Sequence, residues 1–153
     1  MEGIELFNIQ RIKVKLEAQQ KEDAIRALYE LMLESGNVKE TFLESILARE
    51  EKFPTGLKIG DFGIAIPHTE PEHVKEAGIA AAVLKEPVEF QRMDDPEDCV
   101  EAKIIFMMAL KDGHNHLSMI SNIIKMLQNK EVLTKLANAQ SEQEVLEAIH
   151  SNL

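Results

Sequence analysis

The chain has 153 residues, the size of one domain with its own hydrophobic core, and its 44% apolar and 29% charged residues are typical of a globular protein. Acidic residues outnumber basic ones by 27 to 17. The resulting net charge of −10 argues against binding to nucleic acid or anionic lipid, and it permits a partner with a basic face. The single cysteine, Cys99, fits a reducing cytoplasm. Because the chain contains neither a membrane-spanning apolar run nor a signal-peptide pattern, we expect a cytoplasmic protein that does not insert into a membrane.

The first part of the chain predicts one strand and two helices. Residues 10–16 alternate between apolar and basic side chains, which is typical of a strand with one solvent-facing side. Residues 21–34 carry apolar side chains at helical spacing. Asn37 and Glu40 match a capping box, so we expect the second helix to begin directly after Asn37 and to end near Lys52.

The central part predicts a turn at residues 53–57 and then a cluster of strands. Some of these segments alternate, whereas others are continuous apolar runs typical of strands buried on both faces. The predicted strands are residues 62–66, 78–84, 88–90 and 103–110. Pro67 has no N–H to donate, so we expect the chain to leave the sheet there. The acidic run 94–98 favours a solvated loop over a metal or partner loop.

The last part predicts three helices, at residues 116–127, at residues 130–137 and after a capping box formed by Ser141 and Glu144. The order is therefore a strand, two helices, a group of strands and three helices. This order predicts an α/β fold, in which a mixed sheet of about five strands is covered by helices on both faces. We expect a single compact domain over residues 1–153.

Histidines are the strongest candidates for chemistry, because the chain has no phosphate-binding glycine loop, no dinucleotide fingerprint and no nucleophile elbow. His68 follows a predicted strand at a position where α/β proteins place their sites, but a surface histidine after a turn fits equally well. His114 and His116 lie near a helix start, which suits a phosphate, although capping or simple exposure is the favoured interpretation. A zinc site made of these three histidines and a carboxylate is disfavoured by their spacing and the absence of cysteine ligands.

Three segments together resemble one known family. They are residues 63–68 (GIAIPH), the helix end and turn at 48–57 (AREEKFPTGL), and His116 at the start of an amphipathic helix. Nearly the whole chain is similar to the enzyme IIA domain of the bacterial phosphoenolpyruvate-dependent sugar phosphotransferase system (PTS), in the fructose–mannitol class. The second segment and His73 are most similar to the galactitol branch. Thr69 is a departure, because many members have Gly, Ala or Cys after the phosphorylated histidine.

The resemblance implies a phosphocarrier that needs no metal and no cofactor. It implies that His68 accepts the phosphoryl group on Nε2. Arg49 would bind the phosphoryl oxygens through its planar guanidinium, and His116 is the counterpart of the family's second active-site histidine. Thr55 and His114 are expected to stabilise the phosphate through hydrogen bonds.

The resemblance also implies partners. The donor would be the phosphocarrier protein HPr in its phosphorylated form, and the acceptor would be a cysteine of an enzyme IIB, which serves the membrane component enzyme IIC. Enzyme IIC would select the sugar or sugar alcohol, with galactitol among the candidates. One alternative is a regulatory IIA paralogue that signals nitrogen or metal-ion status through its phosphorylation state. Another is a non-catalytic binding module with the same fold, against which the intact His68, Arg49 and His116 count.

Overall fold

A five-stranded mixed sheet forms the centre of this computed structural model, which describes residues 3–153, residues 113–116 by their backbone alone. The strand order is β1-β4-β5-β3-β2. The strands are β1 (Phe7–Leu16), β2 (Gly56–Ile59), β3 (Phe62–Ala65), β4 (Gly78–Gln91) and β5 (Cys99–Ala109). β1 is parallel to β4 and β3 is parallel to β5, whereas the pairs β4–β5 and β2–β3 are antiparallel.

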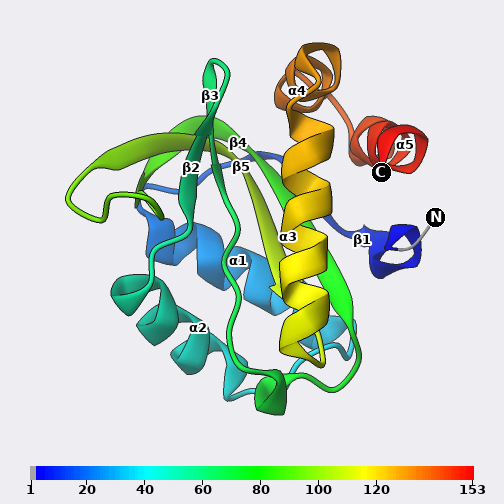
Figure 1. Ribbon diagram of the computed structural model, residues 1–153. Coiled ribbons are helices and arrows are strands. Elements are labelled where there is room, and N and C mark those ends of the chain that lie inside the picture. The colour runs from blue at the N-terminus through cyan, green and yellow to red at the C-terminus, as the bar shows by residue number, and fades with distance from the viewer. Residues whose placement is uncertain (1–2) are drawn as a thin grey trace.

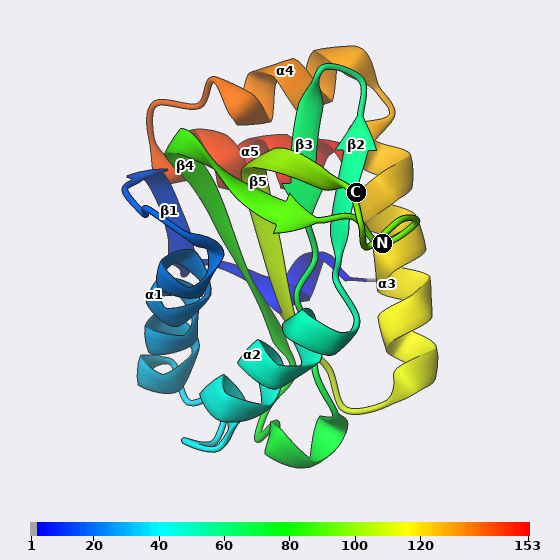
Figure 2. The same cartoon turned by 90° about the vertical axis from the view of Figure 1, so that its left-hand side faces the viewer.

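Helices cover both faces of this sheet (Figure 2). The helices are α1 (Lys21–Glu34), α2 (Phe42–Lys52), α3 (Gly113–Leu127), α4 (Lys130–Ala137) and α5 (Glu142–Asn152). α1 and α2 pack on one face, where their side chains form one hydrophobic cluster with the strands. Residues of α3, α4 and α5 form a second cluster on the opposite face. The predicted α/β fold with a mixed sheet covered on both sides is therefore confirmed.

Alternation along the central strands explains the two clusters. Ile64 and Ile66 belong to the cluster under α3, whereas Ala65 faces α1 and α2. In β5, Ile104 belongs to the cluster under α3, and Ile105 belongs to the cluster with α1 and α2. Because successive side chains of a strand point to opposite faces, a strand buried on both faces must be apolar throughout. This requirement accounts for the continuous apolar runs in the sequence.

Several predicted element boundaries are confirmed and others are wrong. The helices at residues 21–34 and 130–137 have the predicted bounds, and Ser141 caps α5 by accepting a hydrogen bond from Glu144 N. The expected capping box at Asn37 is wrong, because α2 begins at Phe42 and the Asn37 amide instead donates to the carbonyl oxygens of Glu76 and Ala77. The two strands expected at 78–84 and 88–90 form one strand, β4, with a register shift between them. Part of the turn expected at 53–57 belongs to β2.

β3 ends at Ala65, so the strand stops just before Pro67 as expected, but one isolated bridge to the sheet follows it. Although Pro67 cannot donate a hydrogen bond, its carbonyl oxygen accepts one from Met108 N on β5 (3.0 Å), and His68 forms a parallel bridge with Met108. His68 is therefore held beside β5 just beyond the end of β3. Figure 1 shows the chain passing from β3 along α2 towards the end of the molecule at which α3 begins.

No helix in the described part of the chain combines the length and the apolar character that crossing a bilayer requires.

Candidate functional site

His68 is half-buried, and its ring is oriented by the backbone next to it. His68 Nδ1 lies 2.9 Å from the carbonyl oxygen of Ile66. Because a carbonyl oxygen can only accept a hydrogen bond, Nδ1 carries the proton and donates it. In the neutral ring, Nε2 therefore holds the lone pair. Burial lowers the pKa of His68, with the hydrogen bond to Ile66 acting in the opposite direction, so the neutral, nucleophilic form is favoured at neutral pH.

Arg49 extends from the last turn of α2 towards the same region. Its Nη1 donates to Glu70 Oε1 at 2.7 Å, and its guanidinium lies over the ring of Phe53, 4.9 Å from the ring centroid. The positive charge of Arg49 lowers the pKa of His68, so the two side chains are electrostatic neighbours. None of the residues that the structure describes accepts a hydrogen bond from Arg49 Nε, although that atom is buried. Arg49 thus keeps a donor for an anionic group.

Glu50, the residue after Arg49, points into the protein and is only 2% exposed. Its carboxylate accepts two hydrogen bonds of 2.8 Å from Thr55, one from the backbone N–H and one from the hydroxyl. Thr55 Oγ1 in turn accepts a hydrogen bond from Ile66 N (3.1 Å), and the Ile66 carbonyl accepts from His68. We call Glu50, Thr55 and Ile66 the buried brace. It connects the end of α2 to the residue that orients His68.

Thr55 therefore lies in the site region, but its hydroxyl proton is donated to Glu50 and the side chain is buried. This geometry favours a supporting role beneath the site over a direct contact with a phosphate. His114 and His116 lie outside the residues whose side chains are described, so their expected roles stay predictions. Among the described residues, the structure brings together His68, Arg49 and Thr55 from the predicted set.

The buried brace makes the stability of the protein depend on pH. Burial raises the pKa of Glu50 to about 7 from an ordinary value of 4.5, against the hydrogen bonds from Thr55, which lower it. Between these two values the folded protein holds a proton that the unfolded chain releases, so the free energy of unfolding falls as the pH rises. We expect the free energy of unfolding of the wild type to fall by on the order of 3 kcal/mol between pH 4 and pH 8, and we expect Glu50→Gln to remove this fall. Urea unfolding of both proteins across this range measures the difference, and identical pH dependence would contradict it.

Thr69 and Glu70 continue the site beyond His68. Glu70 Oε2 accepts hydrogen bonds from Thr69 Oγ1 (2.8 Å) and Ser45 Oγ (3.3 Å), while Oε1 binds Arg49. The Thr69 hydroxyl thus makes a polar contact that a Gly or Ala at this position would lose. Glu50, Glu70 and Phe53 are site residues that the sequence analysis missed. Glu50 and Phe53 had one signal, their place in the segment 48–57, whereas Glu70 resembles an ordinary loop residue.

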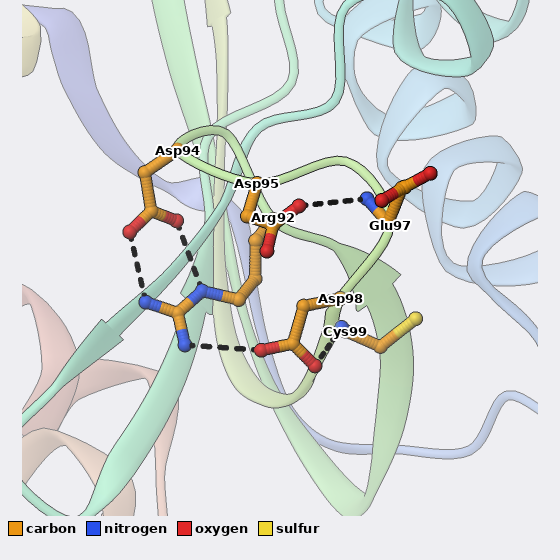
Figure 3. Close-up of polar contacts among 6 residues, drawn as sticks. All are labelled: Arg92, Asp94, Asp95, Glu97, Asp98 and Cys99. Atoms are coloured by element: carbon orange, nitrogen blue, oxygen red, sulfur yellow. Dashed lines mark hydrogen bonds and ion pairs between the residues drawn. The ribbon is translucent and has the colours of Figure 1, made fainter.

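The acidic run expected to be a solvated loop lies at another part of the molecule (Figure 3). Arg92 donates to both carboxylate oxygens of Asp94 (2.9 Å each) and contacts Asp98 at 3.5 Å. Cys99 is exposed beside them and its backbone N–H donates to Asp98. Within the described residues, no three His, Cys, Asp or Glu side chains are grouped so that they could hold a metal ion.

The features described so far define a class of protein. A sheet covered on both faces holds a neutral histidine beside an arginine with an unused donor, an arrangement suited to carrying an anionic group. The profile of the family "Phosphoenolpyruvate-dependent sugar phosphotransferase system, EIIA 2" matches residues 5–152. The chain therefore belongs to this family, and the predicted resemblance is confirmed.

Individual relatives agree with the family. The "PTS system fructose-specific EIIA component" of Haloferax volcanii is 33% identical over 133 residues, which are 84% of this chain and 82% of that protein. The "PTS system fructose-specific EIIABC component" of Bacillus subtilis is 31% identical over 156 residues, but this chain spans only 24% of its length. None of the relatives described here is named for galactitol, so the expected closeness to that branch stays a prediction.

A solved structure shares the fold. It is the "Complex of enzyme IIAMTL and phosphorylated enzyme IIBMTL" from Escherichia coli, which superimposes with a TM-score of 0.80 at 26% identity, covering 95% of this chain and 97% of the other.

Proposed function

We propose that this protein is a phosphocarrier of a sugar-uptake system, which takes a phosphoryl group from phosphorylated HPr onto His68 and passes it to a cysteine of an enzyme IIB. Family membership supports the phosphocarrier role. The observation that carries the assignment to His68 is the hydrogen bond from Nδ1 to the Ile66 carbonyl. This bond fixes the tautomer in which Nε2 has the lone pair needed to attack phosphorus.

The proposed transfer is a displacement at phosphorus. His68 Nε2 attacks the phosphorus of the donor's phosphohistidine, and a new N–P bond forms while the donor's N–P bond breaks and its electron pair returns to the donor ring. The proton on Nδ1 stays in place. The transition state spreads negative charge over three phosphoryl oxygens, so catalysis depends on positioned cationic donors. Arg49 supplies such donors, and His116 is proposed to supply another.

Onward transfer reverses the roles. The thiolate of the IIB cysteine attacks the phosphorus, and the electron pair of the N–P bond returns to Nε2. The pairing with enzyme IIB is supported by the Escherichia coli complex and by the B. subtilis relative, whose name combines the A, B and C components. The net charge of −10 suits a donor with a basic docking face. These partners would place the protein in the cytoplasm, and enzyme IIC would select the sugar, whether fructose, galactitol or another.

The experiment that tests this function uses phosphoenolpyruvate, enzyme I and HPr. We expect intact-mass spectrometry under alkaline conditions to show the gain of one phosphoryl group, which tandem spectrometry assigns to His68. Addition of an enzyme IIB should then remove it. No gain, or a gain at another residue, would contradict the proposal. Acceptance without onward transfer to any IIB of the same genome would instead favour the regulatory alternative.

A further inference from the structure

Glu70 lies two residues after His68 in the sequence, and three side chains donate hydrogen bonds to its carboxylate. Oε1 accepts the 2.7 Å bond from Arg49 Nη1, and Oε2 accepts from the hydroxyls of Thr69 and Ser45. These contacts come from two segments: α2, which provides Arg49 and Ser45, and the loop after His68, which provides Thr69. The hydrogen bond from Thr69 contributes most to lowering the pKa of Glu70 to about 2, so the carboxylate is charged at neutral pH.

Both charges of the Arg49–Glu70 pair act on the His68 ring. Arg49 lowers the pKa of His68 and Glu70 raises it. A phosphoryl group on Nε2 places negative charge at the same ring, and this charge is attracted by Arg49 and repelled by Glu70. The Glu70 carboxylate therefore cancels part of the stabilisation that Arg49 alone would give to the phosphorylated form.

A phosphoryl group need not displace Glu70 to reach Arg49. Glu70 occupies Nη1, whereas the buried Nε has no acceptor among the described residues. The guanidinium can thus bind phosphoryl oxygens through its other donors while Glu70 stays in place, held by Thr69 and Ser45. Glu70 can then keep its contacts with Arg49, Thr69 and Ser45 while His68 carries the phosphoryl group.

We infer that Glu70 raises the phosphoryl-transfer potential of phosphorylated His68. Its carboxylate destabilises phosphohistidine relative to free histidine, so that the phosphoryl group accepted from the donor is readily passed on. This inference rests on the proposed function. Glu70 forms and breaks no bond itself. The donor's N–P bond breaks as the bond to Nε2 forms, and the Nε2–P bond later breaks with its electron pair returning to Nε2. A carrier needs a phosphohistidine of limited stability, because a phosphoryl group that is stabilised too strongly on His68 would not be passed on.

The test is the equilibrium constant for phosphoryl exchange between HPr and this protein, measured at fixed salt by quantifying both phosphoproteins. Glu70→Gln keeps the size of the side chain and an oxygen for Thr69, but it removes the charge. We expect it to shift the equilibrium towards phosphorylated His68 roughly twofold to fivefold, and less at high salt. Glu72→Gln is the matched control, because Glu72 is exposed in the same loop, makes none of these contacts and carries the same charge.

Equal constants in Glu70→Gln and Glu72→Gln would overturn the inference. A shift towards phosphorylated HPr would also overturn it, because it would show that Glu70 only orients Arg49. A second readout does not depend on phosphotransfer: histidine NMR of the unphosphorylated proteins should show a lower pKa of His68 in Glu70→Gln than in the wild type or Glu72→Gln. An unchanged His68 pKa refutes the effect of Glu70 on the ring, whereas failure of wild-type His68 to accept a phosphoryl group refutes the proposed function.

Discussion

Replacing His68 with alanine is expected to abolish phosphorylation by enzyme I and HPr, with no gain of mass under conditions in which the wild-type protein gains one phosphoryl group. His68 is the histidine whose ring the backbone orients with the lone pair on Nε2, and whose pKa is lowered by burial, so in the proposed function it is the nucleophile. Alkaline intact-mass spectrometry at several time points measures the effect.

His73→Ala is the matched control for this experiment. His73 lies five residues further along the chain, beyond Glu70. Its Nδ1 contacts the hydroxyl of Thr41 at 2.8 Å. We expect this variant to be phosphorylated like the wild type. A His68→Ala protein that is folded, as judged by circular dichroism, and still gains a phosphoryl group would show that another residue is the acceptor.

Arg49→Lys is expected to slow phosphoryl transfer on the order of 10²-fold while leaving the fold intact. Lysine keeps the positive charge, but it loses the planar fork that lies over Phe53 and binds Glu70 with one nitrogen while another remains available. Rapid-quench measurement of the single-turnover rate from phosphorylated HPr gives the effect directly. The phosphoryl group should still appear on His68, because the nucleophile is unchanged.

Arg26→Lys provides the comparison for Arg49→Lys, since Arg26 is exposed on α1 and the same substitution there changes neither charge nor site. Its transfer rate should equal that of the wild type. If Arg49→Lys were equally fast, the guanidinium fork would have no part in stabilising the transition state, and a simple positive charge would suffice.

Local pattern predicted the elements whose structure depends on their own residues. The periodicity of residues 21–34 and 130–137 predicted the bounds of α1 and α4, because one apolar face at helical spacing is enough to define each helix. The start of α2 could not be predicted in this way. Asn37 has the chemistry of a helix cap, but in the folded chain its amide binds the carbonyl oxygens of Glu76 and Ala77, some 40 residues away in sequence.

The site also contains residues that the local sequence predicted and residues that only the fold reveals. His68 and Arg49 were predicted from short segments that resemble a family, and the fold places them in one electrostatic neighbourhood. Glu50 could not be recognised as a buried group, because it belongs to a run of four charged residues, 49–52, that looks like a solvated helix end. In the folded chain Glu50 is buried instead, and Thr55, which follows α2, donates to both of its oxygens.

The buried brace also closes the base of the β2–β3 hairpin, because Thr55 immediately precedes β2 and Ile66 immediately follows β3. The two strands meet at an exposed tip that contains Gly60, with a φ of 57°, and Asp61. Changes in the length of this tip are therefore uncoupled from the position of His68, since the bond between Thr55 and Ile66 fixes both ends of the insert. The tip is the natural place to graft a peptide tag or a fluorophore-binding loop that reports on partner docking without altering the transfer chemistry.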